Sequence, residues 1–173
     1  INDKKSIWYK KYLFDLYKSG STPFKWHKEI FEYAKKKNLL CFSTPFDEES
    51  VDKLESLDVP CYKIASFECT DLSLIKKVSK TNKPVIISTG MATLDEIHEA
   101  VECARSNGCK NLAVLKCISI YPAKHEDLNL SSISYFKKVF KCEVGFSDHT
   151  IGIGASVAAV ALGANIIEKH FTL

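Results

Sequence analysis

Short apolar runs alternate with amphipathic stretches along most of this chain, and this alternation restricts the fold more than any other feature of the sequence. The apolar runs cover residues 39–44, 61–66, 84–89, 111–117, 143–149 and 165–171. Stretches with helical periodicity lie between them at residues 48–57, 71–80, 94–106, 130–140 and 153–162, and another precedes the first run at residues 24–38. Continuous apolar runs of this length are typical of strands covered on both faces. The pattern predicts six parallel strands joined by crossover helices.

Two architectures use such strands, a doubly wound open sheet and a closed eight-stranded barrel. In an open sheet only strands near the switch point end on functional polar residues, whereas in a barrel every strand end faces one site. Nearly every run here ends on polar residues, which are Ser43 and Thr44, Ser66 and Glu68, Ser88 and Thr89, Ser119, Ser147–Thr150, and Glu168–His170. The expected α/β fold is therefore a (β/α)8 TIM barrel.

The barrel is expected to be incomplete. An eight-fold barrel typically takes about 250 residues, and only about six of its eight β/α units are visible in these 173 residues. We therefore interpret residues 1–173 as a partial TIM-barrel catalytic domain that lacks the first two strands, as an excised piece of a longer protein would.

Composition removes several classes of function. The 24 basic residues nearly balance the 21 acidic ones without a polybasic block, so neither a nucleic acid nor a membrane surface is an expected partner. No apolar run approaches the roughly 20 residues that span a bilayer, and the first residues lack the apolar stretch of a signal peptide. The seven cysteines are odd in number and contain no Cys-x-x-Cys pair. We expect a soluble, cytoplasmic protein with reduced thiols.

Two histidines follow neighbouring strand runs, His149 in Ser-Asp-His-Thr and His170 in Glu-Lys-His. Because neighbouring parallel strands lie roughly 4.8 Å apart, two such imidazoles can reach one divalent ion. A structural zinc site normally has four protein ligands, so a site with two histidines and open positions indicates Lewis-acid catalysis. Asp148 and Glu168 are candidates to orient the two rings. The alternative is that each histidine is only a hydrogen-bonded strand-end residue.

Hydroxyl groups recur at the other strand ends. Hydroxyls and free amides at strand-to-helix junctions suit a phosphate or a carboxylate, although serine and threonine are also ordinary helix caps there. The residues concerned are Thr44, Ser66, Ser88 with Thr89 and Gly90, Ser119 and Ser147.

Glu68 at a barrel mouth can act as a general acid or base, and the alternative is a solvated loop acid. In a regular strand Lys63 faces away from Ser66 and Glu68, so all three share a site only if the chain bulges or twists. Cys117 has no histidine near it in sequence, and we interpret it as an unreactive buried thiol.

Six motifs at these strand ends resemble, in order, those of the sialic acid synthase family. They are FSTPFD (42–47), KIASFE (63–68), ISTGMA (87–92), KCISIYPA (116–123), GFSDHT (145–150) and IEKHFTL (167–173). The resemblance implies a condensation of phosphoenolpyruvate with an amino-sugar aldehyde that forms a nonulosonic acid and releases phosphate. It also implies the site residues: His149 and His170 as ligands of a divalent metal, Mn²⁺ or alternatively Mg²⁺ or Co²⁺; Glu68 and Tyr121 at the reacting centre and sugar; and Thr44, Lys63, Ser66, Ser88, Ser119 and Ser147 around phosphoenolpyruvate.

Within the family, KIASFE and the KC-x-S-x-YPA wording are similar to pseudaminic acid synthases, which implies a diacetamido-trideoxyhexose as the sugar. N-acetylneuraminate or legionaminate synthesis, another phosphoenolpyruvate-using barrel such as a deoxy-sugar phosphate synthase, and an inactive ligand-binding barrel fragment remain the alternatives. The family's C-terminal antifreeze-like domain, which sends an arginine into the partner's site, is absent from these residues. The resemblance therefore implies a homodimer for the full-length protein.

Overall fold

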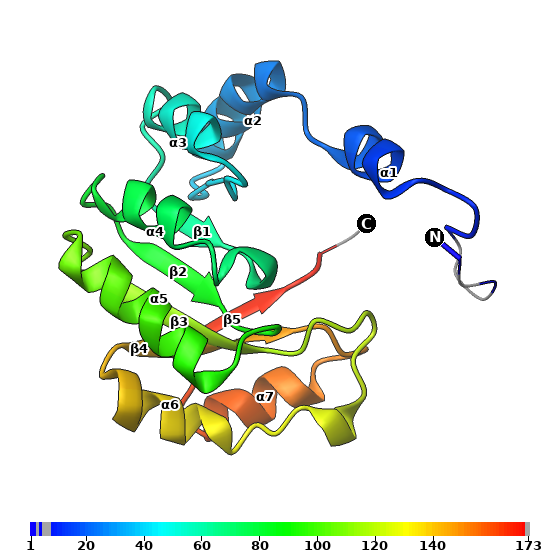
Figure 1. Cartoon of the computed structure of the whole chain (residues 1–173), viewed down its shortest axis with the longest axis vertical. Helices are drawn as coiled ribbons and strands as arrows, with labels where there is room; N and C mark the ends of the chain where they lie inside the picture. Colours follow the sequence, from blue (N-terminus) through cyan, green and yellow to red (C-terminus); the bar gives the residue numbers. More distant parts are fainter. Residues whose placement is uncertain (3, 5–7, 172–173) are drawn as a thin grey trace. The chain divides into compact units, whose positions relative to one another are not determined.

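The computed structural model describes residues 1–2, 4 and 8–171, and contacts divide the chain into two compact units, Ile1–Cys41 and Phe42–Leu173 (Figure 1). The first unit contains helices α1 (Leu13–Gly20) and α2 (Phe24–Lys36). The sequence predicts α2, whereas α1 falls in a segment for which we predict no element. The second unit contains the sheet.

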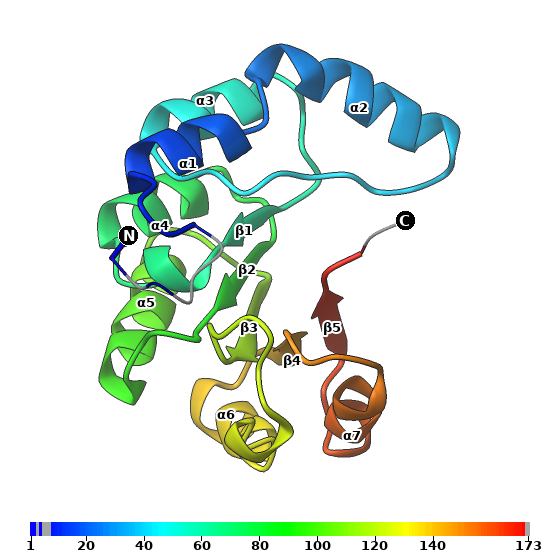
Figure 2. The same ribbon diagram turned by 90° about the vertical axis from the view of Figure 1, so that its right-hand side faces the viewer.

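Five parallel strands form one sheet, in the order in which they occur along the chain. They are β1 (Tyr62–Ile64), β2 (Val85–Ser88), β3 (Leu112–Cys117), β4 (Glu143–Asp148) and β5 (Ile166–Lys169). Figure 2 shows the sheet curving into a half-barrel, with β5 across the lumen from β1 and β2. The incomplete TIM barrel expected from the sequence is confirmed.

The prediction of a sixth strand at residues 39–44 is wrong. Among the described residues this segment has no strand partner, and residues 39–45 contain no regular element. Its composition suits a strand, but a strand also needs a neighbour to pair with its amide and carbonyl groups. Leu39 and Leu40 are accordingly exposed.

Helices cover the outer face of the half-barrel (Figures 1 and 2). They are α3 (Glu48–Glu55), α4 (Leu72–Ser79), α5 (Leu94–Ser106), α6 (Ser132–Phe140) and α7 (Gly154–Ala161), and they match the predicted amphipathic stretches. Side chains at three helix starts accept hydrogen bonds from free backbone amides: Asp47 from Ser50, Asp71 from Leu74, and Thr93 from Glu96 in a capping box. No helix of the described residues is long and apolar enough to span a bilayer.

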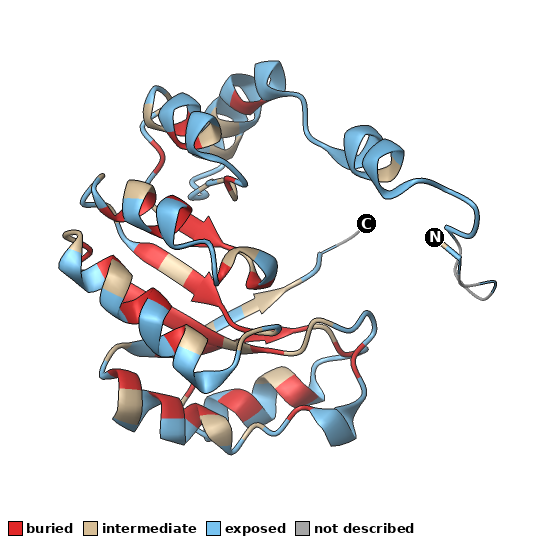
Figure 3. Cartoon of the chain, in the orientation of Figure 1, coloured by how far each residue is buried: buried red, intermediate tan, exposed pale blue. Residues whose placement is uncertain are grey.

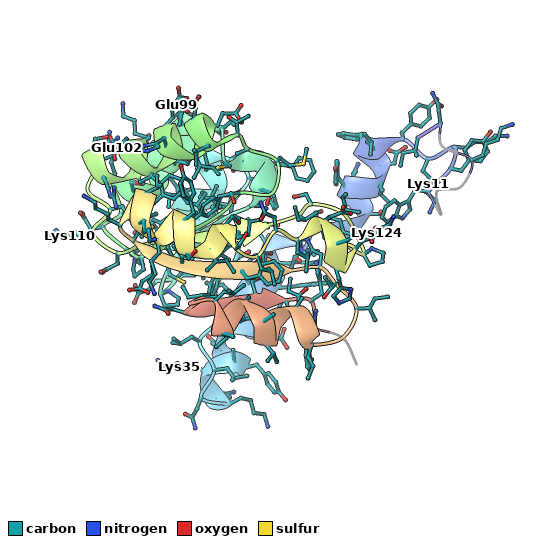
Figure 4. The ribbon with its side chains drawn as sticks, turned by 90° about the horizontal axis from the view of Figure 1, so that it is seen from below. Lys11, Lys35, Glu99, Glu102, Lys110 and Lys124 are labelled. Atoms are coloured by element: carbon teal, nitrogen blue, oxygen red, sulfur yellow. The ribbon has the colours of Figure 1, made fainter. Side chains whose placement is uncertain are left out.

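The core lies between the sheet and these helices, where Figure 3 shows the buried residues of both. Alternate strand residues point outward into it, and they include Tyr62, Ile64, Val85, Ile87, Val114, Val144 and Phe146. On α5 the buried positions Ile97, Ala100, Val101 and Ala104 follow helical spacing and face the core. Glu99 and Glu102 lie on the opposite, solvent-facing side of α5 (Figure 4). Burial of one helix face and one sheet face thus fixes the strands that position the site.

The remaining strand residues face the lumen. The pairing register places Lys63 beside Ile86 and Cys117 beside Ser147, which in turn pairs with Glu168. Residues paired in a parallel ladder share a face, and side chains two positions apart in a strand do too. Five side chains therefore line one surface of the lumen, toward the carboxyl-terminal ends of the strands: Lys63, Ser88, Cys117, Ser147 and Glu168.

Candidate active site

The polar residues predicted at the strand ends gather at the carboxyl-terminal mouth of the half-barrel. The chain leaves β1 through a 3-10 turn at Ser66–Glu68. This turn ends the alternation of the strand, so Lys63 inside the lumen and Glu68 at its mouth can serve one site. Lys63, Ser66 and Glu68 can share a site only if the chain bulges or twists after the strand, and this turn provides that change of direction.

Lys63 and Ser147 are joined through Glu168. The Lys63 Nζ atom lies 3.5 Å from Glu168 Oε2, and the Ser147 hydroxyl donates to Glu168 Oε1 at 2.6 Å. Lys63 also donates to the Ile64 carbonyl at 3.0 Å. Burial lowers the pKa of Lys63, and the neighbouring Glu168 carboxylate opposes that shift. The lumen thus contains a nearly buried cation with one close counter-ion.

Gly90 brings backbone into contact with the serines of two other strand ends. Its amide donates to Ser66 Oγ at 3.0 Å. A Cβ atom at this position would overlap Ser119 Oγ and lie 2.9 Å from Cys117 Sγ. Only glycine allows β2 to approach the loop after β3 this closely. The Gly90 backbone therefore lies close to the serine hydroxyls that follow β1 and β3.

Three buried polar atoms at this mouth have no hydrogen-bond partner among the described residues, namely Glu68 Oε2, Ser88 Oγ and Ser119 Oγ; the fourth such atom, Ser79 Oγ, belongs to α4. A buried polar group without a partner costs about 1–3 kcal/mol, so folded proteins rarely retain several in one place without a ligand. Two of these groups are hydroxyls, one at the end of β2 and one in the loop after β3, at the mouth of the lumen that holds the buried Lys63. This arrangement is suited to the oxygen atoms of a phosphate or a carboxylate.

Glu68 combines a buried oxygen with a shifted proton affinity. Burial raises the pKa of Glu68 above its ordinary value of 4.5, and Asp71 adds to the rise while Lys63 opposes it. A carboxyl group whose pKa moves toward neutrality exchanges protons more readily at physiological pH. Glu68 therefore has the environment of a general acid or base rather than of a solvated loop acid.

His149, His170 and Tyr121 form an aromatic cluster at the ends of the last strands. The ring centroids of His149 and His170 are 5.2 Å apart. The Tyr121 ring lies 4.2 Å from His149 and 5.7 Å from His170. The pKa of Tyr121 is raised, and burial is the largest cause. Tyr121 thus carries a neutral hydroxyl on a ring that lies beside both imidazoles.

The backbone of the loop after β3 fixes His149. Its Nδ1 atom lies 2.7 Å from the Ile118 carbonyl oxygen, and its own carbonyl accepts from the Ala123 amide at 2.9 Å. Because a carbonyl oxygen only accepts, Nδ1 carries the proton and the lone pair is on Nε2. That tautomer suits a metal ligand.

The donor set fits a divalent metal with open coordination positions. A metal–nitrogen bond of about 2.1 Å places a ring centroid roughly 3.2 Å from the ion, so rings about 5 Å apart can share one. The separation of His149 and His170 meets that condition. Among the described residues, no group of three or more histidine, cysteine, aspartate or glutamate side chains is placed to enclose a metal. The described residues therefore present two imidazoles to a metal ion.

The structure contradicts the prediction that Asp148 and Glu168 orient the two histidine rings. Asp148 faces the helices, where it accepts from Thr150, from Ser156 of α7 and from Lys169. Alternation along a strand explains the error for Asp148, because the residue directly before a lumen-facing histidine must point outward. Glu168 faces the lumen, but its two oxygens are engaged by Lys63 and Ser147.

No hydrogen bond of the described chain joins Thr44 to the other predicted site residues. It lies half-buried in the irregular segment before α3. Gly90, which the sequence places with Ser88 and Thr89 at a strand end, contacts the Ser66 hydroxyl through its amide. Sequence reasoning missed the Ile118 carbonyl, which is a backbone atom and leaves no signal in the sequence. Cys117 does have a histidine nearby in space, since its sulfur lies 3.9 Å from His149 Nδ1. That nitrogen, however, is hydrogen-bonded to the Ile118 carbonyl oxygen.

Parallel strands curved into half a barrel, with polar groups from every strand end at one mouth, define this unit as part of a TIM-type β/α barrel. The model of the NeuB family matches residues 1–173, and the chain belongs to this family. It is 46% identical over 168 residues to a pseudaminic acid synthase of Helicobacter pylori, covering 97% of this chain and 49% of that protein. It is 52% identical over 149 residues to an N,N'-diacetyllegionaminic acid synthase of Campylobacter jejuni, covering 85% and 45%.

A solved structure has the same fold. The N-acetylneuraminic acid synthetase from Leptospira borgpetersenii, in complex with citrate, superposes with a TM-score of 0.88 at 36% identity, covering 91% of this chain and 55% of that one. The chain thus spans about half the length of the curated relatives it matches.

Proposed function

We propose that the protein containing this chain condenses phosphoenolpyruvate with an amino-sugar aldehyde to form a nonulosonic acid and inorganic phosphate. The observation that carries the proposal is a group of buried polar atoms without partners among the described residues, Glu68 Oε2, Ser88 Oγ and Ser119 Oγ, at the mouth of the lumen that holds the buried Lys63. These groups suit a small anion with several oxygens. Family membership and the identities to pseudaminic and legionaminic acid synthases support the choice of reaction.

The anionic substrate binds through donors from four strands and the loops that follow them. Lys63 supplies a charge, Ser88, Ser119 and Ser147 supply hydroxyls, and Ser66 holds the Gly90 backbone in place. Charge-assisted hydrogen bonds of this kind are the strong ones for phosphate and carboxylate groups. Thr44 belongs to the proposed set by its motif alone.

His149 and His170 would hold the divalent ion, for which we propose Mn²⁺, with Mg²⁺ or Co²⁺ as alternatives. When bound, such an ion supplies Lewis-acid polarisation of the aldehyde oxygen. The chain's own part is to present the two nitrogens, with His149 held by Ile118, and to place the sugar against Tyr121. Phosphoenolpyruvate on the serine side and the aldehyde on the histidine side then meet over the lumen.

The reaction follows from that placement. The methylene carbon of the enol phosphate attacks the aldehyde carbon, and the electron deficiency at the neighbouring carbon is relieved when water adds to it. The tetrahedral adduct then collapses to a keto group as its carbon–oxygen bond to phosphate breaks. One proton of the attacking water passes to the alkoxide formed from the aldehyde oxygen. The other, released from the hydroxyl of the adduct as the keto group forms, passes to the departing phosphate. Glu68 accepts and returns these protons. Its raised pKa is suited to both directions of transfer.

The sugar we propose is a diacetamido-trideoxyhexose, as in pseudaminic acid synthesis; legionaminate or N-acetylneuraminate synthesis is the alternative. A pocket that hydrogen-bonds a second acetamido group rejects a sugar that lacks it. We also propose a cytoplasmic homodimer. Seven free thiols support a reducing compartment, and the family resemblance, in which an arginine reaches the partner's site, supports the dimer.

Calorimetric titration of phosphoenolpyruvate tests the proposal. With Mn²⁺ present, the full-length protein should bind phosphoenolpyruvate, and a diacetamido-trideoxyhexose should then be consumed at a higher kcat/KM than N-acetylmannosamine. Turnover with a phosphorylated sugar alone would instead indicate a deoxy-sugar phosphate synthase. Binding without any turnover would indicate an inactive ligand-binding barrel.

A further inference from the structure

The two oxygens of the Glu168 carboxylate each engage a group that we assign to the substrate anion. Oε2 lies 3.5 Å from Lys63 Nζ, and Oε1 accepts from Ser147 Oγ at 2.6 Å. The two carboxylate oxygens of Glu168 therefore contact Lys63 and Ser147 as two oxygens of a bound anion would. Its position comes from the ladder, in which Glu168 pairs with Ser147 on the lumen face.

Lys63 and Glu168 differ sharply in their access to water. The Lys63 side chain is 7% exposed, whereas that of Glu168 is 41% exposed. A buried ammonium without a counter-charge is strongly unfavourable, but a carboxylate at the mouth can return to solvent at little cost. If a second anion takes Lys63, Glu168 can withdraw and Lys63 remains neutralised.

The other groups around Lys63 do not replace Glu168 in this role. The Ile64 carbonyl accepts one hydrogen bond from the ammonium and carries no charge. Glu68 and Cys117 act on Lys63 only more weakly than Glu168 does, and burial raises the pKa of Glu68. Glu168 is thus the principal counter-ion of Lys63 among the described residues.

We propose that Glu168 is a positioning residue that serves as an internal counter-ion: it holds the Lys63 ammonium and the Ser147 hydroxyl in the lumen and is displaced from both by the substrate anion. This inference rests on the proposed function. It implies a cost, because Glu168 competes with phosphoenolpyruvate for Lys63 and repels its negative charge.

The test compares binding of phosphoenolpyruvate and of inorganic phosphate by calorimetry in full-length wild type, Glu168→Gln and Glu143→Gln. Glu143 gives a matched control, since it lies on the lumen side of β4 at the opposite end of the strand. Glu168→Gln should tighten Kd for both ligands about five- to tenfold, whereas Glu143→Gln should leave it unchanged. In a Lys63→Met background the tightening from Glu168→Gln should disappear, which a purely structural role would not produce.

The wild-type protein supplies a second measurement that needs no variant of Glu168 to fold. In a structure with phosphoenolpyruvate bound, Glu168 should lie beyond the roughly 4 Å limit of an ion pair with Lys63. An intact pair in that structure, or equal or weaker binding by a folded Glu168→Gln protein, overturns the inference while leaving the proposed function in place. Failure of the wild-type protein to bind phosphoenolpyruvate overturns both.

Discussion

Lys63 and Glu168 form an ion pair across the lumen, with 3.5 Å between Nζ and Oε2, although they belong to the first and last strands of the sheet. In a flat sheet four strand spacings of about 4.8 Å would separate those strands by roughly 19 Å. The contact therefore records the curvature that turns five parallel strands into half a barrel. The same curvature brings groups from distant parts of the sequence to one mouth.

Replacing Gly90 with alanine should damage the anion site. The new Cβ would overlap Ser119 Oγ, so the backbone must shift and its amide should leave Ser66. We expect a loss of about tenfold or more in phosphoenolpyruvate affinity, measured by calorimetry. Gly154→Ala is the matched control, because nothing lies within 4 Å of a Cβ there and the position begins α7. Equal affinity in the two variants would show that the close approach of Gly90 is irrelevant to binding.

Glu68→Gln should separate activity from stability. The pKa of Glu68 is raised in the folded protein, so ionising the side chain costs stability as pH rises through that pKa. The variant should therefore have a higher Tm than the wild type at pH 7.5 and no such gain well below pH 4.5, where Glu68 is protonated in both states. Turnover should fall by about a hundredfold or more, since a general acid–base group is lost. Wild-type turnover in the folded variant would rule out the catalytic role.

Asp148→Asn should destabilise the fold. Burial alone would raise the pKa of Asp148, but hydrogen bonds from Ser156, Lys169 and Thr150 hold it at about 2. Because this pKa lies below the ordinary 3.8, the stabilisation is present above about pH 3.8 and is lost as pH falls toward 2. Denaturant unfolding at pH 7 should show a loss of about 2–4 kcal/mol for Asp148→Asn.

The control for this prediction is Asp52→Asn, which breaks the exposed pair between Lys77 and Asp52. Exposed pairs contribute less than about 1 kcal/mol. If both variants lost the same small amount, the Asp148 network would not be a significant part of the stability of the β4–α7 connection.

Replacing His149 or His170 with alanine should each abolish the binding of one Mn²⁺. The two rings lie 5.2 Å apart, and neither histidine alone offers more than one nitrogen to the ion. Electron paramagnetic resonance of free Mn²⁺ gives the stoichiometry, which should be one per wild-type subunit. His98→Ala should bind as wild type does, because His98 packs against Phe140. Retention of the bound ion in the double variant would refute the assignment.

The apolar runs and the helical spacing of the sequence are enough to predict the parallel strands, the helices of the second unit and the cluster of polar strand ends. Both patterns follow directly from which residues are buried. The sequence cannot predict the pair between Lys63 and Glu168, since that contact depends on how far the sheet curves. Nor can it predict that a carbonyl, at Ile118, holds His149. For residues 39–44 the composition favours a strand, yet pairing depends on a neighbour that composition does not reveal.

Phosphate release is the most direct test of the proposed condensation. The full-length protein should be mixed with phosphoenolpyruvate, Mn²⁺ and a diacetamido-trideoxyhexose, and free phosphate should be measured alongside the sugar that disappears. We predict one phosphate for each sugar consumed and none when the sugar is omitted, because the carbon–oxygen bond to phosphate breaks only in the adduct. Phosphate release that does not depend on the sugar, or no release with the sugar present, would contradict the proposal.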